Sequence, residues 1–261
     1  MASRSIKGTS LNFGIVSIGV NVYTATTSHA REVAFKTLHR EDSSPVRMPK
    51  ICIQCGKELS TEETVKGFPI DKTSFVVLDE SDLALLPLKS MQSIDILAFG
   101  EGDLPDPRMA DTPYFLGASE KSVKAYMLLA GAMLATSTYA VAKFALRDRE
   151  HLCVIRPFGK VLLLQTVHWA DELKDTDEFI PDRKGQVSFT DKEKMLGVAL
   201  VNSMKKSVNF GEYPDDYRDA LLELVKAKQE GRVLTAAPVA RKEETSLLDA
   251  LEASLAIANK T

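Results

Sequence analysis

The sequence predicts a mixed α/β fold that is mainly β, in which an antiparallel sheet curls into a barrel and a helical arm follows it. Short apolar runs recur through the first 169 residues, separated by Gly, Pro or charged breaks, a pattern typical of antiparallel strands joined by tight turns. Only one long helical pattern interrupts these runs, so repeated βαβ units are not indicated. After Trp169 the pattern changes: residues 170–185 are acidic and irregular, and the helices of the arm follow them.

The first predicted strands form a hairpin about Gly14, over residues 10–24. Apolar and polar residues alternate from Val16 to Tyr23, as in a half-buried strand, and Gly19 within it predicts a bulge or a sharp bend. Pro49 cannot donate a ladder hydrogen bond, so its strand is assigned to a sheet edge. Further strands are expected over 33–39, 46–53, 64–68, 75–78, 93–99 and 114–116, with a short helix from Asp79 or Ser81 through Leu86.

Residues 139–169 predict three consecutive antiparallel strands, the centre of the fold. The second runs from His151 to Arg156 and stops at Pro157, and the third, over 161–167, is apolar almost throughout, as in a strand covered on both sides. In the first strand one face holds Ala140, Ala142, Phe144 and Leu146, and the other holds Val141, Lys143, Ala145 and Arg147.

Four helices are predicted around and after this meander. The first spans 119–136, is capped by Ser119 and has an apolar stripe of Val123, Tyr126, Met127, Ala130, Met133 and Leu134. In the arm, Thr190 and Glu193 form a capping box that opens one helix, and a second helix ends at Gly231. A last helix, beyond the arm, follows Thr245 or Ser246. We therefore divide the chain into a barrel core (1–189), a helical arm (190–231) and a linker with a C-terminal helix (232–261).

The formal net charge of −3 hides alternating blocks of charge. Residues 1–60 carry a net +4, residues 61–120 carry −8, residues 121–169 carry +5 and residues 170–231 carry −4. Such alternation indicates a basic surface on one side of the protein and an acidic surface on another. Ordinary fluctuation among solvated side chains explains it equally well.

The cysteine content indicates a reducing, cytoplasmic setting. There are three cysteines, an apolar signal segment is absent from the N-terminus, and no stretch approaches the ~18 apolar residues of a membrane span. Cys52, Cys55 and Gly56 resemble half of a zinc ribbon, but a second C-x-x-C and suitably spaced histidines are missing. We therefore expect no metal and no cofactor, and a turn with free thiols is favoured over a zinc site, including one shared between two subunits.

Catalytic motifs are absent from the sequence. It contains no Gly-rich phosphate loop, no G-x-S-x-G and no H-E-x-x-H. The carboxylate pairs Glu62/Glu63 and Glu178/Asp182 are typical of solvated loops, and His151 is interpreted as a surface histidine rather than a general base. We expect a binding protein without catalytic residues.

The clustered cations are the candidate binding residues. Few aromatic residues lie among them, so base stacking on single strands is not indicated. Cations without stacking partners suit phosphate contacts to a duplex, which give affinity without sequence readout. The candidates are Arg31, Lys36, Arg40, Arg47, Lys50, Lys57, Lys66, Lys143, Arg147, Arg149, Arg156 and Lys160.

The chain resembles the bacterial and phage Ku proteins, which load onto DNA double-strand ends. The segments that carry the resemblance cover nearly the whole chain: IKGTSLNFGIVSIGVNVYTAT, KICIQCGKEL, TVKGFPIDKTSFVVLDESDL, VAKFALRDREHLCVIRP, VLLLQTVHWADEL and LLDALEASL.

The resemblance implies a homodimer whose subunits close a ring around the duplex, with part of residues 1–189, including Pro49, forming a bridge across the DNA. It also implies sequence-independent binding of DNA ends in non-homologous end joining, and recruitment of a DNA ligase through the C-terminal region. Two alternatives stay open, a metal-dependent nucleic-acid-processing enzyme and a protein-binding scaffold. The residues expected to contact the ligase are Leu247, Leu248, Leu251 and Leu255.

Overall fold

The computed structural model describes residues 4–27, 34–79, 81–82, 93–102, 106–146, 149–179, 185, 188–232 and 247–258. The chain divides into two compact units, one of Met1–His29 with Phe35–Lys174 and the other of Ala30–Ala34 with Asp175–Thr261. The predicted division at residues 189/190 and 231/232 stays a prediction.

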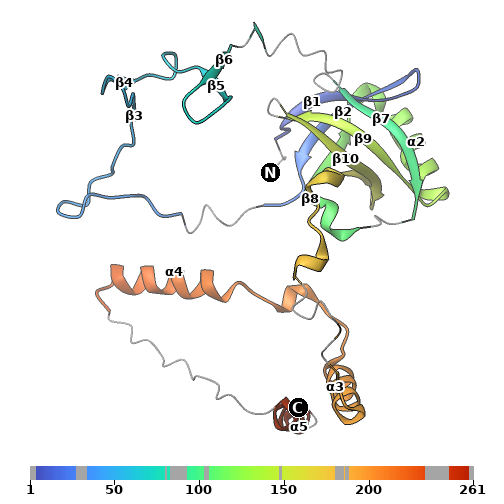
Figure 1. Ribbon diagram of the computed structural model, residues 1–261. Coiled ribbons are helices and arrows are strands. Elements are labelled where there is room, and N and C mark those ends of the chain that lie inside the picture. Colours follow the sequence, from blue (N-terminus) through green and yellow to red (C-terminus); the bar gives the residue numbers. More distant parts are fainter. Residues whose placement is uncertain are drawn as a thin grey trace. The chain divides into compact units, whose positions relative to one another are not determined.

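Seven strands of the first unit form a closed barrel (Figure 1). Their order around the barrel is β1-β2-β8-β11-β10-β9-β7, with β1 and β7 parallel and the other neighbouring pairs antiparallel. The predicted barrel and its three-strand meander, β9 to β11, are confirmed. The strands are β1 (Lys7–Phe13), β2 (Val16–Thr24), β7 (Ser93–Glu101), β8 (Ala110–Ala118), β9 (Thr138–Leu146), β10 (Arg149–Phe158) and β11 (Val161–Val167).

Alternating side chains fill the inside of the barrel. In β9, Ala140, Ala142 and Phe144 are fully buried, whereas Lys143 between them is half-buried on the outer face. Because a barrel of this size is just wide enough for side chains to fill, its interior is a core and not a channel. The strand residues of this core are Leu11, Ile18, Val20, Val22, Ile94, Leu116, Ala140, Ala142, Phe144, Cys153, Ile155, Leu162 and Leu164.

Helix α2 (Val123–Ala135) joins this core through Tyr126, Leu129 and Met133. The Tyr126 hydroxyl donates to the carbonyl oxygen of Leu116 at 2.5 Å and accepts from the amide of Leu162 at 2.6 Å. It therefore bridges β8 and β11, and burial raises its pKa. The predicted apolar stripe is only partly right. Its members Val123, Met127 and Leu134 are exposed, whereas Leu129, which was not predicted, is buried.

Gly19 in β2 lets the side chain of Ser119 come close to the strand backbone. The predicted bulge is absent, since the β1–β2 register is continuous through Gly19. A Cβ at Gly19 would lie 2.5 Å from the hydroxyl oxygen of Ser119. The Gly19 amide also donates to Ser122 Oγ at 3.0 Å. Ser119 makes no side-chain cap hydrogen bond, and the short 3₁₀ helix η4 (Glu120–Ser122) precedes α2 instead. The missing side chain thus lets the start of the helix dock on the strand.

Residues 35–79, which we call the excursion, lie between β2 and β7 in the sequence and form two small hairpins. β3 (Lys50–Ile51) pairs with β4 (Glu58–Leu59), and β5 (Lys66–Pro69) pairs with β6 (Phe75–Leu78). The predicted strands at 64–68 and 75–78 are confirmed within two residues. The strand predicted at 46–53 shrinks to two residues, and the described part of 33–39 contributes one isolated bridge, Leu38 to Pro45. No residue of the excursion is buried.

The second unit contains α3 (Asp191–Met204), α4 (Asp216–Gln229) and α5 (Leu247–Ala258). The predicted capping box is present, because Thr190 Oγ1 accepts from the amide of Glu193 and the Glu193 carboxylate accepts from the amide of Thr190. Gly231 has a φ of +70° just past α4, as predicted for a helix stop. Helix α5 packs against α3, with Lys192 Nζ 2.8 Å from Glu252 Oε1. Besides η4, the described residues contain four more 3₁₀ helices, η3 (Pro107–Met109), η5 (Ala170–Glu172), η6 (Thr176–Phe179) and η7 (Phe210–Glu212).

Candidate nucleic-acid interface

The packed barrel interior excludes a duplex from its centre. A DNA duplex can therefore contact the outer face of the barrel, the excursion or the helical unit, but it cannot pass through the barrel. The predicted cations must be judged by their places on these outer surfaces.

Lys143 lies on the outer face of β9 and is already engaged. Its Nζ is 3.0 Å from Glu150 Oε2 on β10 and 5.5 Å from the centre of the Trp169 ring. Glu150 is mostly buried, so this pair is better shielded from solvent than a surface ion pair. The pair ties β9, β10 and the segment after β11 together, and a structural role accounts for this lysine as well as phosphate binding does.

The other cations of the meander lie at its outer face and its ends. Arg156 is half-buried on β10, with Nη2 3.4 Å from Gln165 Oε1 on β11, while Arg149 and Lys160 are exposed at the start of β10 and in the turn before β11. Predicted residue Arg147 falls outside the described residues, as does Arg31.

The excursion carries six of the predicted cations, and all six are exposed. Lys57 is paired with Glu63 at 2.5 Å, and this ion pair lowers the pKa of the Glu63 carboxyl. With the residues that the structure describes, no ion pair is found for the other five, which are Lys36, Arg40, Arg47, Lys50 and Lys66. Exposed guanidinium and ammonium groups on a segment without a core of its own are suited to phosphate contacts.

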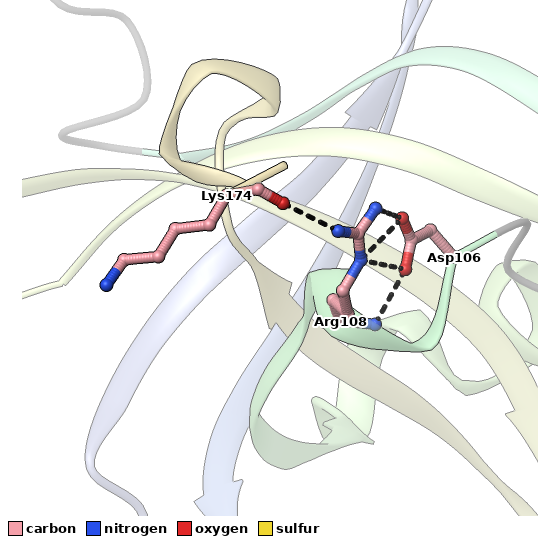
Figure 2. A network of polar contacts seen from close by, with 3 residues as sticks. All are labelled: Asp106, Arg108 and Lys174. Carbon is pink, nitrogen blue, oxygen red and sulfur yellow. Dashed lines mark hydrogen bonds and ion pairs between the residues drawn. The ribbon is translucent and has the colours of Figure 1, made fainter. Parts of the chain in front are cut away.

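Arg108 was not among the predicted residues, and its guanidinium is already engaged by Asp106 and by the backbone of Lys174. Its guanidinium makes a fork on Asp106, with Nε 3.0 Å from each carboxylate oxygen, and its Nη1 donates to the carbonyl oxygen of Lys174 at 2.8 Å (Figure 2). These hydrogen bonds hold the pKa of Asp106 below its usual value. The arginine thus fastens the segment after β11 to η3.

The proposed ligase helix α5 makes contacts within its own unit. Leu251 and Leu255 are half-buried while α5 packs on α3, and the side chains of Leu247 and Leu248 lie outside the described residues. A ligase that binds these leucines must contact the paired helices or displace α5.

The cysteines differ sharply in their surroundings. Burial raises the pKa of Cys153 to about 12, and its thiol donates to the carbonyl oxygen of Ala142 at 3.3 Å, so it is a core residue without nucleophilic character. Hydrogen bonding from the backbone of Cys55, from its thiol and from the backbone of Gln54 lowers the pKa of Cys52. Among the described residues, no three His, Cys, Asp or Glu side chains lie close enough together to hold a metal ion.

None of the helices in the described part of the chain is long and apolar enough to cross a membrane.

Comparison with known proteins decides the family. Residues 12–196 match the Ku family, described as the Ku70/Ku80 beta-barrel domain. The chain belongs to the Ku family. Ku proteins bind DNA ends without catalysis, so the predictions of a non-catalytic DNA-binding protein of double-strand-break repair are confirmed by this membership.

Individual relatives match over most of their length. The non-homologous end joining protein Ku of Archaeoglobus fulgidus is 36% identical over 246 residues, covering 94% of this chain and 96% of the relative. The protein of the same name from Mycobacterium tuberculosis is 32% identical over 267 residues, covering 98% and 96%. That of Bacillus subtilis is 30% identical over 250 residues, covering 94% and 79%.

Proposed function

We propose that two copies of this Ku-family chain close a ring around double-stranded DNA ends in the cytoplasm and recruit a DNA ligase there. The observation that carries the proposal is the excursion, 45 consecutive residues that leave the barrel and bury none of their own side chains. Such a segment needs a partner surface to cover its apolar side chains. Its exposed lysines and arginines indicate that a polyanion binds next to that surface.

The apolar side chains of the excursion support a second copy as the partner. Phe35 is 77% exposed, Met48 is 86% exposed and Phe68 is 60% exposed, although these residue types are usually buried. Exposed apolar clusters of this kind mark interaction surfaces. Covering them is worth about 25 cal/mol per Å² of apolar surface. The further exposed apolar residues are Leu38, Val46, Ile51, Ile53, Val65, Ile70, Phe75, Val76 and Val77.

The cations of the same segment support DNA as the enclosed ligand. Lys36, Arg40, Arg47, Lys50 and Lys66 are exposed along it, and phosphate contacts need no base sequence. Once two excursions meet, such cations can face one duplex from two sides. A closed ring admits DNA only by threading from an end, so selectivity for ends follows from topology.

We assign the ligase contact to the paired helices α3 and α5. Leu251 and Leu255 supply apolar surface that stays half exposed in the pair. Deletion of residues 240–261 should keep DNA-end binding and abolish stimulation of the ligase. Loss of DNA binding in this truncation would contradict the assignment, since the barrel and the excursion are intact in it.

The test of the ring is a gel-shift comparison of one linear duplex with the same DNA as a closed circle, at equal concentration and salt. The linear form should be shifted and the circle should not. Capping both ends of the linear duplex with a bulky protein such as streptavidin should remove the shift. Equal binding to circle and line would rule out the ring and favour a basic scaffold surface, and a requirement for added metal would favour the enzyme.

A further inference from the structure

Helix α2 is apolar on its outer face as well as on the face that joins the barrel core. From Met127 to Ala135 it carries no charged residue. Met127 is 56% exposed, Leu128 is 74% exposed and Leu134 is 70% exposed. A helix that is apolar all round is usually buried on all sides. The outer face of α2 therefore has the character of a surface that another molecule covers.

Gly131 lies in the middle of this outer face. Residues 127, 131 and 134 are spaced by four and three positions, so they form one row along the helix. Glycine is a poor residue for a helix interior, and a Cβ at Gly131 would lie in open space, so no packing of the described residues requires a glycine there. The missing side chain leaves a notch between Met127 and Leu134, where the backbone of a second molecule can approach closely.

The row ends at a pocket beside the C-terminal end of α2. Its volume is about 340 Å³, within the range of small-ligand sites. Met133, Leu134 and Pro157 supply apolar surface, and Arg156 is the charged residue of the lining. Because Leu134 belongs both to the row and to the lining, one ligand can contact the helix face and the pocket together.

Arg156 is only weakly engaged within the chain. Among the described residues its guanidinium makes one hydrogen bond, a long one of 3.4 Å from Nη2 to Gln165 Oε1, and it has no ion-pair partner. In the same part of the chain, the lining hydroxyls of Ser137 and Tyr139 have no hydrogen-bond partner either. Ser137 has a φ of +51°, a strained conformation of the kind that gathers at binding sites. A guanidinium beside free hydroxyls is suited to bind a carboxylate or a phosphate.

The surroundings of Arg156 favour a single carboxylate on an apolar body over a polyanion. The C-terminal end of α2 carries the partial negative charge of its last carbonyl groups. Glu101 is the register partner of Thr138, a residue of the lining, so an acidic residue borders the pocket. Both repel the closely spaced phosphates of DNA, to which the apolar row offers no contact. The charged residue of α2 itself, Lys124, lies at the other end of the row, so both ends attract an acidic ligand.

We propose that the outer face of α2 is a docking surface for a segment of a partner protein that combines apolar and acidic residues. A carboxylate of the segment binds Arg156, and its apolar side chains lie on Met127 and Leu134, across Gly131. The row from residue 127 to residue 134 is about 10 Å long. Five extended residues span about 16 Å, so a pentapeptide reaches from Met127 into the pocket. This docking surface is separate from DNA-end binding and does not depend on the ring.

The test follows the methyl groups of Met127 and Met133 by NMR in the full-length protein labelled at its methionine methyls. The probe is the acetylated and amidated pentapeptide Leu-Ala-Ala-Leu-Asp, and the same peptide ending in Asn is its uncharged match. The Asp peptide should shift both methyl resonances and bind at least tenfold more tightly than the Asn peptide. Arg156→Gln should abolish that difference in affinity. Arg149→Gln, at the start of the same strand, should keep it.

A second variant tests the notch. Gly131→Gln fills it without placing a side chain against the rest of the described chain, and it should weaken binding of the Asp peptide at least tenfold. Gly197→Gln is the matched control, because Gly197 is also a helical glycine with open space around it, in α3. Binding to that control should be unchanged, and unchanged binding to Gly131→Gln would contradict the docking mode.

Four other results would each overturn the docking surface. The first is equal binding of the two peptides, and the second is a shift of Met195, 65% exposed in α3, as large as that of Met127. The third is a shift of Met133 by inorganic phosphate or linear duplex in place of the peptide, which would make Arg156 a phosphate ligand. The fourth is a shift of Met127 when the peptide-free protein is diluted from dimer to monomer, which would mean that a second copy covers the helix.

The gel-shift comparison of linear and circular DNA separates this inference from the proposed function. Gly131→Gln should shift linear DNA as the unchanged protein does, even though it no longer binds the peptide. Loss of the gel shift in this variant would assign α2 to the DNA-binding ring and overturn the separate docking surface. A failure of the unchanged protein to prefer linear DNA would overturn the ring and leave the peptide result standing.

Discussion

The barrel and the excursion are made from similar apolar residues but use them in opposite ways. Phe144 of the barrel is fully buried, whereas Phe75 of the excursion is 61% exposed. The barrel strands find partners within the chain, and the excursion has only two small hairpins. One chain is enough to bury the apolar side chains of the barrel, whereas those of the excursion stay exposed in a single chain, as our proposal of a second copy requires.

The largest effect is expected in the barrel. Phe144→Ala removes a fully buried ring and should lower the free energy of unfolding by about 3–5 kcal/mol. Phe75→Ala is the matched excursion variant and should change it by less than about 0.5 kcal/mol when the chain is dilute enough to be monomeric. Urea unfolding followed by circular dichroism compares the two. Equal losses would mean that the excursion has a core of its own.

A smaller effect is expected on dimerisation. The double substitution of Phe68→Ser and Phe75→Ser removes exposed apolar surface that we assign to the second copy. It should raise the dimer dissociation constant at least about tenfold, or ~1.4 kcal/mol, without changing the unfolding of the monomer. Sedimentation velocity over a concentration series measures this. Phe210→Ser, at an 85% exposed position in the second unit, should leave the constant unchanged. An unchanged constant in the Phe68/Phe75 double variant would contradict the assignment of these two residues to the interface.

The smallest effect is expected on DNA affinity. Lys66→Gln removes one exposed cation of the excursion and should weaken binding to linear duplex a few-fold, equally for any sequence. The slope of log K against log salt should fall by about 0.9, the value for one lost phosphate contact. Lys192→Gln, whose lysine pairs with Glu252, should leave the slope unchanged. An unchanged slope in Lys66→Gln would mean that Lys66 makes no phosphate contact.

The sequence predicted the barrel because its pattern reports burial within one chain. The alternation in β9 placed Ala140 and Phe144 on one face and Lys143 on the other, and the structure buries the face of Ala140 and Phe144. The prediction failed at residues 46–53, where apolar residues occur but only Lys50 and Ile51 have a strand partner. A pattern of apolar residues does not show whether the surface that buries them belongs to the same chain or to another.

Two polar features of the site could not be predicted for a similar reason. Arg108 looked like any cation of an acidic block, yet its fork on Asp106 depends on the fold bringing Lys174 close. Lys143 looked available for phosphate, but its pairing with Glu150 follows from the β9–β10 register. The pairing of Arg108 with Asp106 could have been suspected from the sequence, since the two residues are two positions apart. The contact with Lys174, 66 positions away, could not.

The seam between β1 and β7 sets an order of events for the growing chain. β1 pairs with a strand 83 residues further along, and Asn12 reaches Asp95 across that seam at 3.1 Å. During synthesis the first hairpin must therefore wait, with its β1 edge open, until the excursion and β7 have left the ribosome. Its β2 edge waits longer, for β8. Contacts between such distant positions slow folding. A chaperone that shields this edge would act before residue 101 emerges.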